Sequence, residues 1–211
     1  MRAKPGFRVQ GSVSAIACAA TSDTEHAARS ALTFTNRQRA RRLNLAFLRR
    51  ILRHLLAPRE ATRSEAPAAS PRQPPASAYD LCFHFVTAEE MARVNWQFLQ
   101  HEGSTDVITF DHSQPTAPAP APRRQPPAPL SGEAFICVAD AVKQAREFKT
   151  SWQSEVVRYA IHAVLHLRGY DDLQPAKRRV MKREENRLLR GLAAAFDLSD
   201  LEKQVARKSR A

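Results

Sequence analysis

The sequence has few cysteines, few aromatic residues and no long apolar run, and each shortage disfavours a class of protein. Its three cysteines form no C-x-x-C pair and are irregularly spaced, which argues against a disulfide framework and favours a reducing, cytoplasmic setting. No segment reaches the roughly 20 apolar residues of a membrane helix, so we expect no membrane partner. Aromatic residues make up only 7% of the chain, which gives little support to a platform for stacking unpaired bases.

Acidic residues are also scarce relative to basic ones. The chain has 33 Lys and Arg against 21 Asp and Glu, and its net charge is +12. Such an excess indicates a polyanionic partner, with nucleic acid as the first candidate. Seven arginines and no acid lie between Arg37 and Arg53. A second basic cluster follows later: Lys177, Arg178, Arg179, Lys182 and Arg183. Each cluster fits either salt-dependent attraction to an RNA backbone or a merely solvated helix face.

Low-complexity stretches divide the chain. Residues 1–30 show no sustained periodicity and predict a disordered leader. Their basic residues before "VSAIACAA" imitate a secretion signal only faintly, because the apolar part is short. Pro-rich segments at about 57–78 and 113–131 predict loop insertions within a single domain over residues 31–198. Residues 199–211 are expected to form a basic tail.

The segments between these stretches alternate between strand and helix patterns. Residue type and period-two alternation predict four strands: Ala31–Asn36, Tyr79–Thr87, Thr105–His112 and Glu133–Asp140. Apolar spacing predicts five helices, over Arg37–Leu56, from Thr87 as N-cap to Leu99, and over Ala139–Thr150, Ser151–Arg168 and Gln174–Phe196. The expected fold class is therefore α+β, a small mixed four-stranded sheet covered by about five helices.

The segment "HAVLHLRGYDD", His162–Asp172, has the pattern of a metal site at the end of a central helix. His162 and His166 are four residues apart, so both side chains can face one cation. Gly169 can end the helix in the left-handed conformation, after which Asp171 or Asp172 could supply a third ligand. Three protein ligands and a water form a catalytic zinc site. Two histidines satisfied in the core or on a wet face are the alternative.

The same segment lacks the general base of a zinc peptidase. The H-E-x-x-H motif places a glutamate directly after the first histidine, and Ala163 occupies that position here. Peptide hydrolysis in that manner is therefore disfavoured, and a zinc peptidase is only a distant alternative.

Three blocks of the sequence resemble the YbeY family of bacterial rRNA maturation endoribonucleases. "HAVLHLRGYDD" is similar to the family signature H-G-x-x-H-L-x-G-Y-D-H. "VNWQFLQHEGSTDVITF" (Val94–Phe110) resembles L-N-x-x-[YF]-R-x-x-x-x-x-T-D-V-L-S-F. "GEAFICVADAVKQA" (Gly132–Ala145) is similar to the family's G-D-I-x-I-C strand and the helix after it. Order and spacing agree over roughly residues 32–196.

The resemblance implies a cytoplasmic, metal-dependent endoribonuclease of the single-strand type that hydrolyses phosphodiester bonds in ribosomal RNA. It implies a role in rRNA maturation, including 3′-end processing, and in ribosome quality control, with the small ribosomal subunit as partner. One divalent ion, expected to be zinc, would activate the attacking water, and no side chain is assigned as catalytic beyond that water. The alternative is a ribosome-binding assembly factor with weak or vestigial nuclease activity.

Two positions depart from the family pattern. The family's third histidine ligand corresponds to Asp172, so the expected ligands are His162, His166 and Asp172. Asp171 is the rival third ligand, or else a hydrogen-bond partner of a ligating imidazole. The family's arginine after [YF] corresponds to Leu99, which removes a phosphate clamp and weakens the expectation of full activity. Further candidates for ligand orientation or RNA contact are Asp106, Arg168 and His101.

Overall fold

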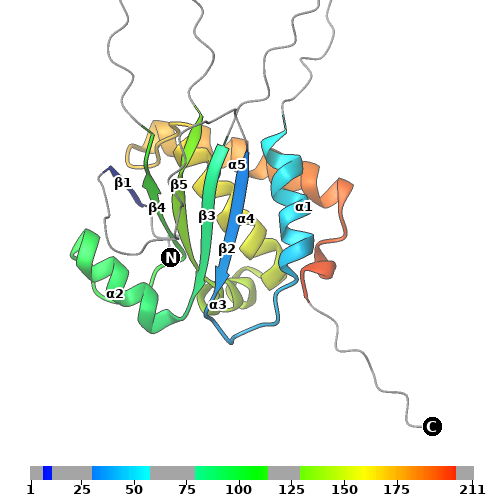
Figure 1. The fold of residues 1–211 in the computed structure, drawn as a ribbon, viewed down its shortest axis with the longest axis horizontal. Helices are drawn as coiled ribbons and strands as arrows, with labels where there is room; N and C mark the ends of the chain where they lie inside the picture. Colours follow the sequence, from blue (N-terminus) through cyan, green and yellow to red (C-terminus); the bar gives the residue numbers. More distant parts are fainter. Residues whose placement is uncertain (1–6, 11–29, 58–78, 114–128, 203–211) are drawn as a thin grey trace, which may run out of the picture.

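Five strands form one mixed sheet, in the order β1-β4-β5-β3-β2 (Figure 1). The structure is a computed structural model, and it describes residues 7–10, 30–57, 79–113 and 129–202. Strand β4 runs antiparallel to β5, and every other neighbouring pair of strands is parallel. The strands are β1 (Phe7–Gln10), β2 (Ala31–Asn36), β3 (Tyr79–Val86), β4 (Val107–Asp111) and β5 (Leu130–Cys137).

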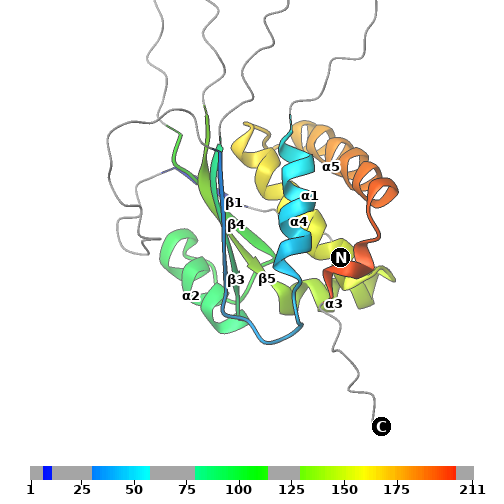
Figure 2. The ribbon, with the colours of Figure 1, turned by 45° about the vertical axis from the view of Figure 1, so that its right-hand side comes forward.

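Helices cover both faces of this sheet. Figure 2 shows α2 on one face and the remaining helices on the other. Helix α4 lies against β4 and β5 and also contacts α1, α3 and α5. The helices are α1 (Leu45–Leu56), α2 (Ala88–Leu99), α3 (Val138–Phe148), α4 (Trp152–Leu167) and α5 (Pro175–Ala195), followed by the 3-10 helix η1 (Leu198–Leu201). None of the helices in the described ranges combines the length and apolar character that crossing a membrane requires.

Strand alternation divides the core into two clusters. Phe83 and Phe85 of β3 point into the larger cluster, which also contains Ile161 and Val164 of α4. The next residue, Val86, points to the opposite face, where it packs with residues of α2. Because α4 is buried among the sheet and three other helices, its side chains are held on a rigid element.

The expected α+β class is confirmed, with all four expected strands and five α-helices present. Strand β2 has the expected bounds, and α2 begins after Thr87, whose Oγ accepts a hydrogen bond from the Glu90 N–H at 3.2 Å. Strand β1 adds a fifth strand at the edge of the sheet. It falls inside the leader expected over residues 1–30, and its four residues are too few for alternation to be recognised. Residues 1–6 and 11–29 of that leader lie outside the described residues.

The expected start of the first helix is wrong. Helix α1 begins at Leu45 instead of Arg37, because Asn44 caps it. The Asn44 Oδ1 accepts a hydrogen bond from the Phe47 N–H at 3.1 Å, while the Asn44 N–H donates to the Leu201 carbonyl at 2.8 Å. A contact with the far end of the chain therefore fixes where this helix starts.

One segment expected as a loop insertion and one expected as a basic tail belong partly to the folded unit. Residues 130 and 131 of the second insertion are the start of β5, where they pair in parallel with β3. Residues 199–202 of the expected tail also fold, because Leu201 is fully buried and Glu202 forms a bridge with Leu43. Residues 58–78, 114–128 and 203–211 lie outside the described part of the chain.

The expectation that the cysteines form no disulfide holds for the two cysteines that the structure describes. Cys82 and Cys137 are both buried and unbridged. Cys18 lies outside the described residues. The two described thiols therefore contribute to packing, as apolar runs around them predicted.

Gly132 allows β5 to approach the end of α4 closely. A Cβ added at this residue would lie 2.4 Å from the Phe110 carbonyl oxygen and 2.6 Å from Cδ2 of Leu167. Neither gap accommodates a carbon atom, and the backbone oxygen cannot easily move. The last turn of α4, which carries His166, is thus seated directly against the sheet backbone.

Candidate metal centre

Helix α4 presents His162 and His166 side by side. Its N-terminus is capped by Ser151, whose Oγ accepts a hydrogen bond from the Ser154 N–H at 3.1 Å. The Nε2 atoms of His162 and His166 lie 3.0 Å apart. The His166 residue is 2% exposed, whereas the His162 side chain retains 15% exposure. The pair is therefore closed off from solvent on the His166 side and open on the His162 side.

A glycine turn ends α4 and reverses the chain. Gly169 has a φ of 86°, in the left-handed region. Its N–H donates to the His166 carbonyl at 2.9 Å, and the Tyr170 N–H donates to the Leu165 carbonyl at 3.0 Å. This pair of bonds is the Schellman arrangement, which satisfies carbonyls that a helix end leaves open. The turn directs the residues after it back toward the two histidines.

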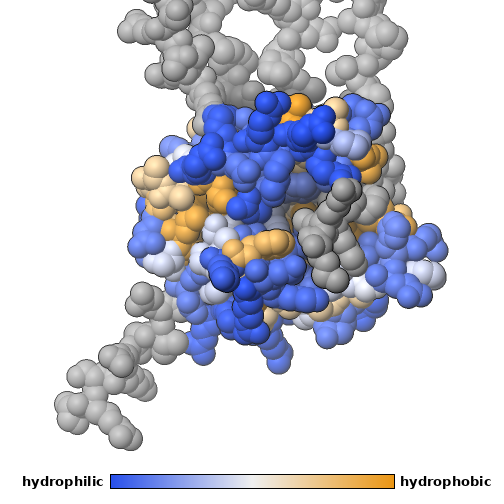
Figure 3. Space-filling view, turned by 180° about the vertical axis from the view of Figure 1, so that it is seen from behind, coloured by the Kyte–Doolittle hydropathy of each residue, from blue (hydrophilic) through white to orange (hydrophobic). Residues whose placement is uncertain are grey.

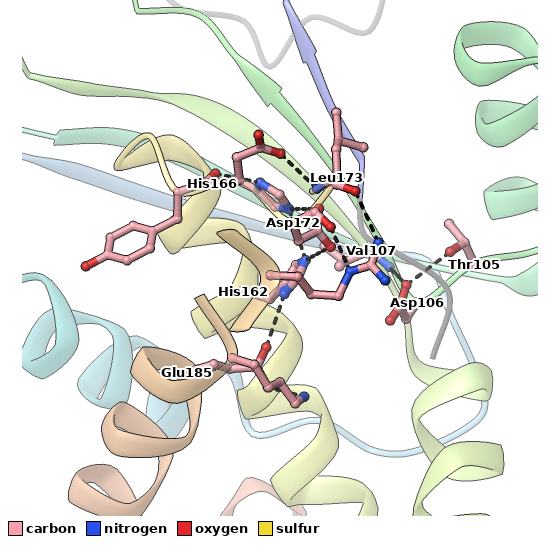
Figure 4. A network of polar contacts seen from close by, with 12 residues as sticks. Thr105, Asp106, Val107, His162, His166, Asp172, Leu173 and Glu185 are labelled. Atoms are coloured by element: carbon pink, nitrogen blue, oxygen red, sulfur yellow. Dashed lines mark hydrogen bonds and ion pairs between the residues drawn. The ribbon is translucent and has the colours of Figure 1, made fainter. Parts of the chain in front are cut away.

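Asp172 completes a group of three donor side chains (Figure 4). Its Oδ2 lies 3.9 Å from Nε2 of His162, and its Oδ1 lies 3.8 Å from Nε2 of His166. Donor atoms of a tetrahedral zinc site stand about 3.4 Å apart, given metal–ligand bonds of about 2.0–2.1 Å. The three measured separations fall on either side of this value. Two imidazoles and a carboxylate at such distances fit a divalent metal ion.

Asp171 points away from this group. Its Oδ1 accepts a hydrogen bond from the Leu173 N–H at 2.9 Å, and its Oδ2 pairs with Nζ of Lys177 at 3.0 Å. These two bonds hold the pKa of Asp171 below its usual value. The carboxylate thus organises the turn before α5, and of the two neighbouring aspartates it is Asp172 that faces the histidines.

Each histidine has an acceptor on its outer side. Nδ1 of His166 lies 3.1 Å from the Tyr170 carbonyl oxygen, which can only accept. Nδ1 of His162 lies 3.1 Å from Oε2 of Glu185. We therefore assign the Nδ1 proton to both neutral rings, so that each Nε2 directs a lone pair toward the other and toward Asp172.

Glu185 is a buried carboxylate held in its ionised form. It is 3% exposed and receives hydrogen bonds from Arg158 Nη1 at 2.8 Å and Lys182 Nζ at 2.6 Å. Burial acts to raise its pKa, but the hydrogen bond from His162 and the two cations outweigh burial and lower the pKa to about 2. Glu185 is therefore an acceptor for the His162 ring at any ordinary pH.

Glu185 was not among the residues expected from the sequence. A signal was present, because Glu185 occupies one of the core-facing positions of α5, whose other buried residues are Met181, Leu188, Leu189 and Leu192. An acid within an apolar stripe needs a buried partner. That partner lies on another helix, 23 residues away in sequence, so the pairing could not be read locally.

Asp106 lies just before β4, where its side chain accepts hydrogen bonds from a backbone N–H and from a hydroxyl. Its Oδ1 accepts hydrogen bonds from the Thr105 hydroxyl and from the Val107 N–H, both at 3.0 Å. Burial raises the pKa of Asp106, while the nearby His162 and the hydrogen bonds from Val107 and Thr105 act in the opposite direction. The structure thus gives Asp106 a role in ordering the start of β4.

The remaining candidates from the sequence do not join the three donors. Arg168 donates from Nη2 to the Leu55 carbonyl at 3.2 Å, which ties the end of α4 to the end of α1. His101 is exposed in the loop between α2 and β4. Leu99 is partly buried against the cluster beneath α2, so an apolar contact replaces the guanidinium that the family pattern has there.

A mixed sheet with two imidazoles and a carboxylate gathered at the end of a buried central helix defines the chain as a candidate metal-dependent hydrolase. The family model described as endoribonuclease YbeY matches residues 33–193. The chain belongs to this family. Membership supports the enzyme class of a nuclease, which is a hydrolase that cuts within RNA.

Two relatives, from Chlorobium and Parabacteroides, agree with the family assignment. The chain is 34% identical to the endoribonuclease YbeY of Chlorobium phaeovibrioides over 115 residues, which cover 54% of this chain and 70% of the relative. It is 34% identical to the endoribonuclease YbeY of Parabacteroides distasonis over 110 residues, which cover 52% and 69%. A solution structure of a Thermotoga maritima protein aligns with 85% of this chain and 100% of its own, at 17% identity and a TM-score of 0.48.

Proposed function

We propose that this chain is a metal-dependent endoribonuclease and that His162, His166 and Asp172 hold one divalent ion. An ion bound there would acidify a water molecule and polarise a phosphoryl oxygen, the two requirements of phosphodiester hydrolysis. The protein's own contribution is orientation: Glu185 and the Tyr170 carbonyl hold the two rings with Nε2 inward. Asp172 adds a negative charge that offsets part of the charge of the cation.

One observation carries the proposal. The two Nε2 atoms lie 3.0 Å apart with a buried carboxylate beside them, and with both protons assigned to Nδ1 three electron-rich groups converge on one point. A proton on one Nε2 or a metal cation between the groups relieves this repulsion, and a divalent cation engages all three donors at once. Imidazole and carboxylate ligands suit zinc and also tolerate manganese, and zinc is the ion we propose.

The biological role follows from the family and from the charge of the chain. We infer that the substrate is ribosomal RNA, that the work is rRNA maturation, including 3′-end processing, together with ribosome quality control, and that the small ribosomal subunit is the partner. The net charge of +12 supports a polyanionic partner, and a cytoplasmic site of action follows from that role.

Metal analysis and RNA cleavage on the same preparations test the proposal. The full chain, His166→Ala and the control His54→Ala are purified, and their metal content is measured. Each is then given a labelled single-stranded RNA with chelator, and with chelator followed by excess zinc or manganese. We expect stoichiometric metal and metal-restored cleavage in the wild type and in His54→Ala, and neither in His166→Ala. Full metal or chelator-resistant cleavage in His166→Ala would refute the assignment.

A second function is favoured by Leu99. Its partly buried apolar side chain leaves no guanidinium where the family pattern has one, so phosphate would be held less firmly there. The chain would then act as a ribosome-binding assembly factor with weak or vestigial nuclease activity. Stable binding to small ribosomal subunits, with no cleavage in any of the metals, would select this function over the first.

A further inference from the structure

The outer face of α5 carries three arginines that are free to bind a ligand. Arg179, Arg183 and Arg190 are exposed, and among the described residues none of them has an ion-pair or hydrogen-bond partner. At 3.6 residues per turn the three side chains fall within about 40° of one another around the helix axis. They therefore form one line along α5, which we call the arginine stripe.

Other basic residues of α5 are already engaged. Lys177 pairs with Asp171 at 3.0 Å, and Lys182 with Glu185 at 2.6 Å. Arg178 donates to the carbonyl of Asp172 at 2.7 Å. Their charges are partly neutralised or directed inward, so the uncompensated positive charge of this helix gathers on the arginine stripe.

Several of the arginines between Arg37 and Arg53 are held by neighbouring side chains. The Arg37 guanidinium lies 2.5 Å from Oε1 of Glu90. That of Arg49 lies 4.9 Å from the ring centroid of Phe34, and that of Arg50 lies 5.7 Å from the ring of Phe47. Such contacts hold β2 and α1 against their neighbours. Arg39, Arg42 and Arg53 of this cluster are exposed as well, but Arg39 and Arg42 precede α1, so they do not share one helix with Arg53 as the residues of the arginine stripe do.

The arginine stripe begins about one turn into the helix that follows the proposed metal ligands in the sequence. Helix α5 starts three residues after Asp172 and is fastened to the site by the bond between Glu185 and His162. From Arg179 to Arg190 the helix advances about 16 Å, at about 1.5 Å per residue. The stripe faces away from the core, since the buried residues of α5 lie on the other side of the helix. Figure 3 shows that hydrophilic residues cover most of the face behind the sheet.

We propose that the arginine stripe binds the sugar–phosphate backbone of RNA, on the side of α5 that faces away from the core. This inference rests on the proposed function, because it takes the substrate to be RNA. Guanidinium groups match phosphate oxygens in pairs, and a line of them follows a backbone without reading its bases. The low aromatic content fits recognition through charge instead of base stacking.

RNA binding in the presence of chelator tests the stripe separately from cleavage. The probe is a fluorescein-labelled single-stranded RNA, and its affinity is measured by anisotropy across a series of KCl concentrations. The test variant carries Arg179→Gln, Arg183→Gln and Arg190→Gln. The control variant loses the same net charge from exposed residues of α2 and α3: Arg93→Gln, Lys143→Gln and Arg146→Gln.

The expected loss follows from counterion release. Each phosphate contact on a single strand contributes about 0.7 to the slope of log affinity against log salt, so three contacts contribute about 2. We expect the test variant to lose about 2 from that slope and on the order of 100-fold in affinity at 0.1 M salt. The control should stay within about threefold of the wild type, and both variants should keep its melting temperature.

Three results would overturn the arginine stripe as an RNA-binding surface. The first is a test variant whose log affinity falls with log salt as steeply as that of the wild type. The second is a control variant that loses as much RNA affinity as the test variant. The third is a test variant that binds RNA as the wild type does but no longer binds phosphatidylserine vesicles. The last result would assign the stripe to a lipid surface. Since the assay contains no metal, its outcome does not depend on the ligand assignment. Failure of metal-dependent cleavage would in turn refute the proposed function and leave the binding result standing.

Discussion

Replacement of Glu185 should weaken metal binding while leaving the fold intact. Glu185→Gln keeps the size and one acceptor oxygen but loses the charge, whereas Glu185→Ala leaves the Nδ1 proton of His162 without its acceptor. Loss of the outer partner of a metal-bound histidine costs about 10- to 100-fold in metal affinity. That range equals about 1.4–2.7 kcal/mol. We expect roughly tenfold for the Gln variant and roughly a hundredfold for the Ala variant.

The cost to the free energy of unfolding should be moderate. Removing one partner of a buried ion pair can cost about 3–5 kcal/mol when the other charge is stranded. Here Arg158 keeps Glu155 at 3.2 Å and the Asn186 side-chain oxygen at 2.9 Å. The side chain of Lys182 is 53% exposed and can return to water. We therefore expect Glu185→Ala to lose about 1–3 kcal/mol in the metal-free protein.

Zinc competition against a chromophoric chelator measures the affinity, and denaturant unfolding of the metal-free protein measures the stability. The control is Glu184→Gln, one residue away, whose carboxylate pairs with Arg187 at the surface. Nitrogen-15 NMR of His162 adds a direct readout, because the wild-type ring should carry its proton on Nδ1 and the Ala variant should lose that preference. If Glu185→Ala binds zinc within twofold of the control, Glu185 does not position His162.

Three further predictions concern single residues. Asp172→Ala should lose stoichiometric zinc in a metal titration while Asp171→Ala keeps it; the reverse pattern would move the ligand assignment by one residue. Burial acts to lower the pKa of His84, but hydrogen bonds raise it to about 9. Protonated His84 should therefore add up to about 3 kcal/mol below pH 6.5, and this should be lost as pH rises through 9. A stability difference between wild type and His84→Gln that is equal at pH 6 and pH 10 would contradict this. Gly132→Ala should cost about 1–3 kcal/mol through overpacking against Leu167, and an unchanged melting temperature would refute it.

Features of the fold that depend on neighbouring residues could be predicted, and those that depend on distant ones could not. The cap of α2 was readable because Thr87 and Glu90 lie three residues apart. The start of α1 was not, since residues 37–43 suit a helix but Asn44 is bonded to Leu201 at the other end of the domain. The edge strand β1 was missed because pairing with β4 defines it, not its own four-residue pattern.

In the candidate site, too, the residues set by local sequence could be predicted and those set by packing could not. His162 and His166 share a helix face by spacing alone, and Gly169 ends that helix by its own conformational freedom. The choice between two adjacent aspartates could not be made from the sequence, because it depends on which carboxylate the turn sends inward. Glu185 could not be predicted for another reason. It contacts the His162 ring only because α5 packs on α4.

The turn at Gly169 has a consequence for how the site assembles. The three donor side chains come from eleven consecutive residues, so little chain entropy is lost when they meet. The donors can therefore gather early in folding, before the distant strands of the sheet have paired. An added Cβ at Gly169 would meet no atom within 4 Å, so Gly169→Ala acts only through its left-handed backbone, at about 1–2 kcal/mol. Under the proposed function, an ion held there would also hold the last turn of α4 against fraying, and slower amide exchange at Gly169 and Tyr170 would report its arrival.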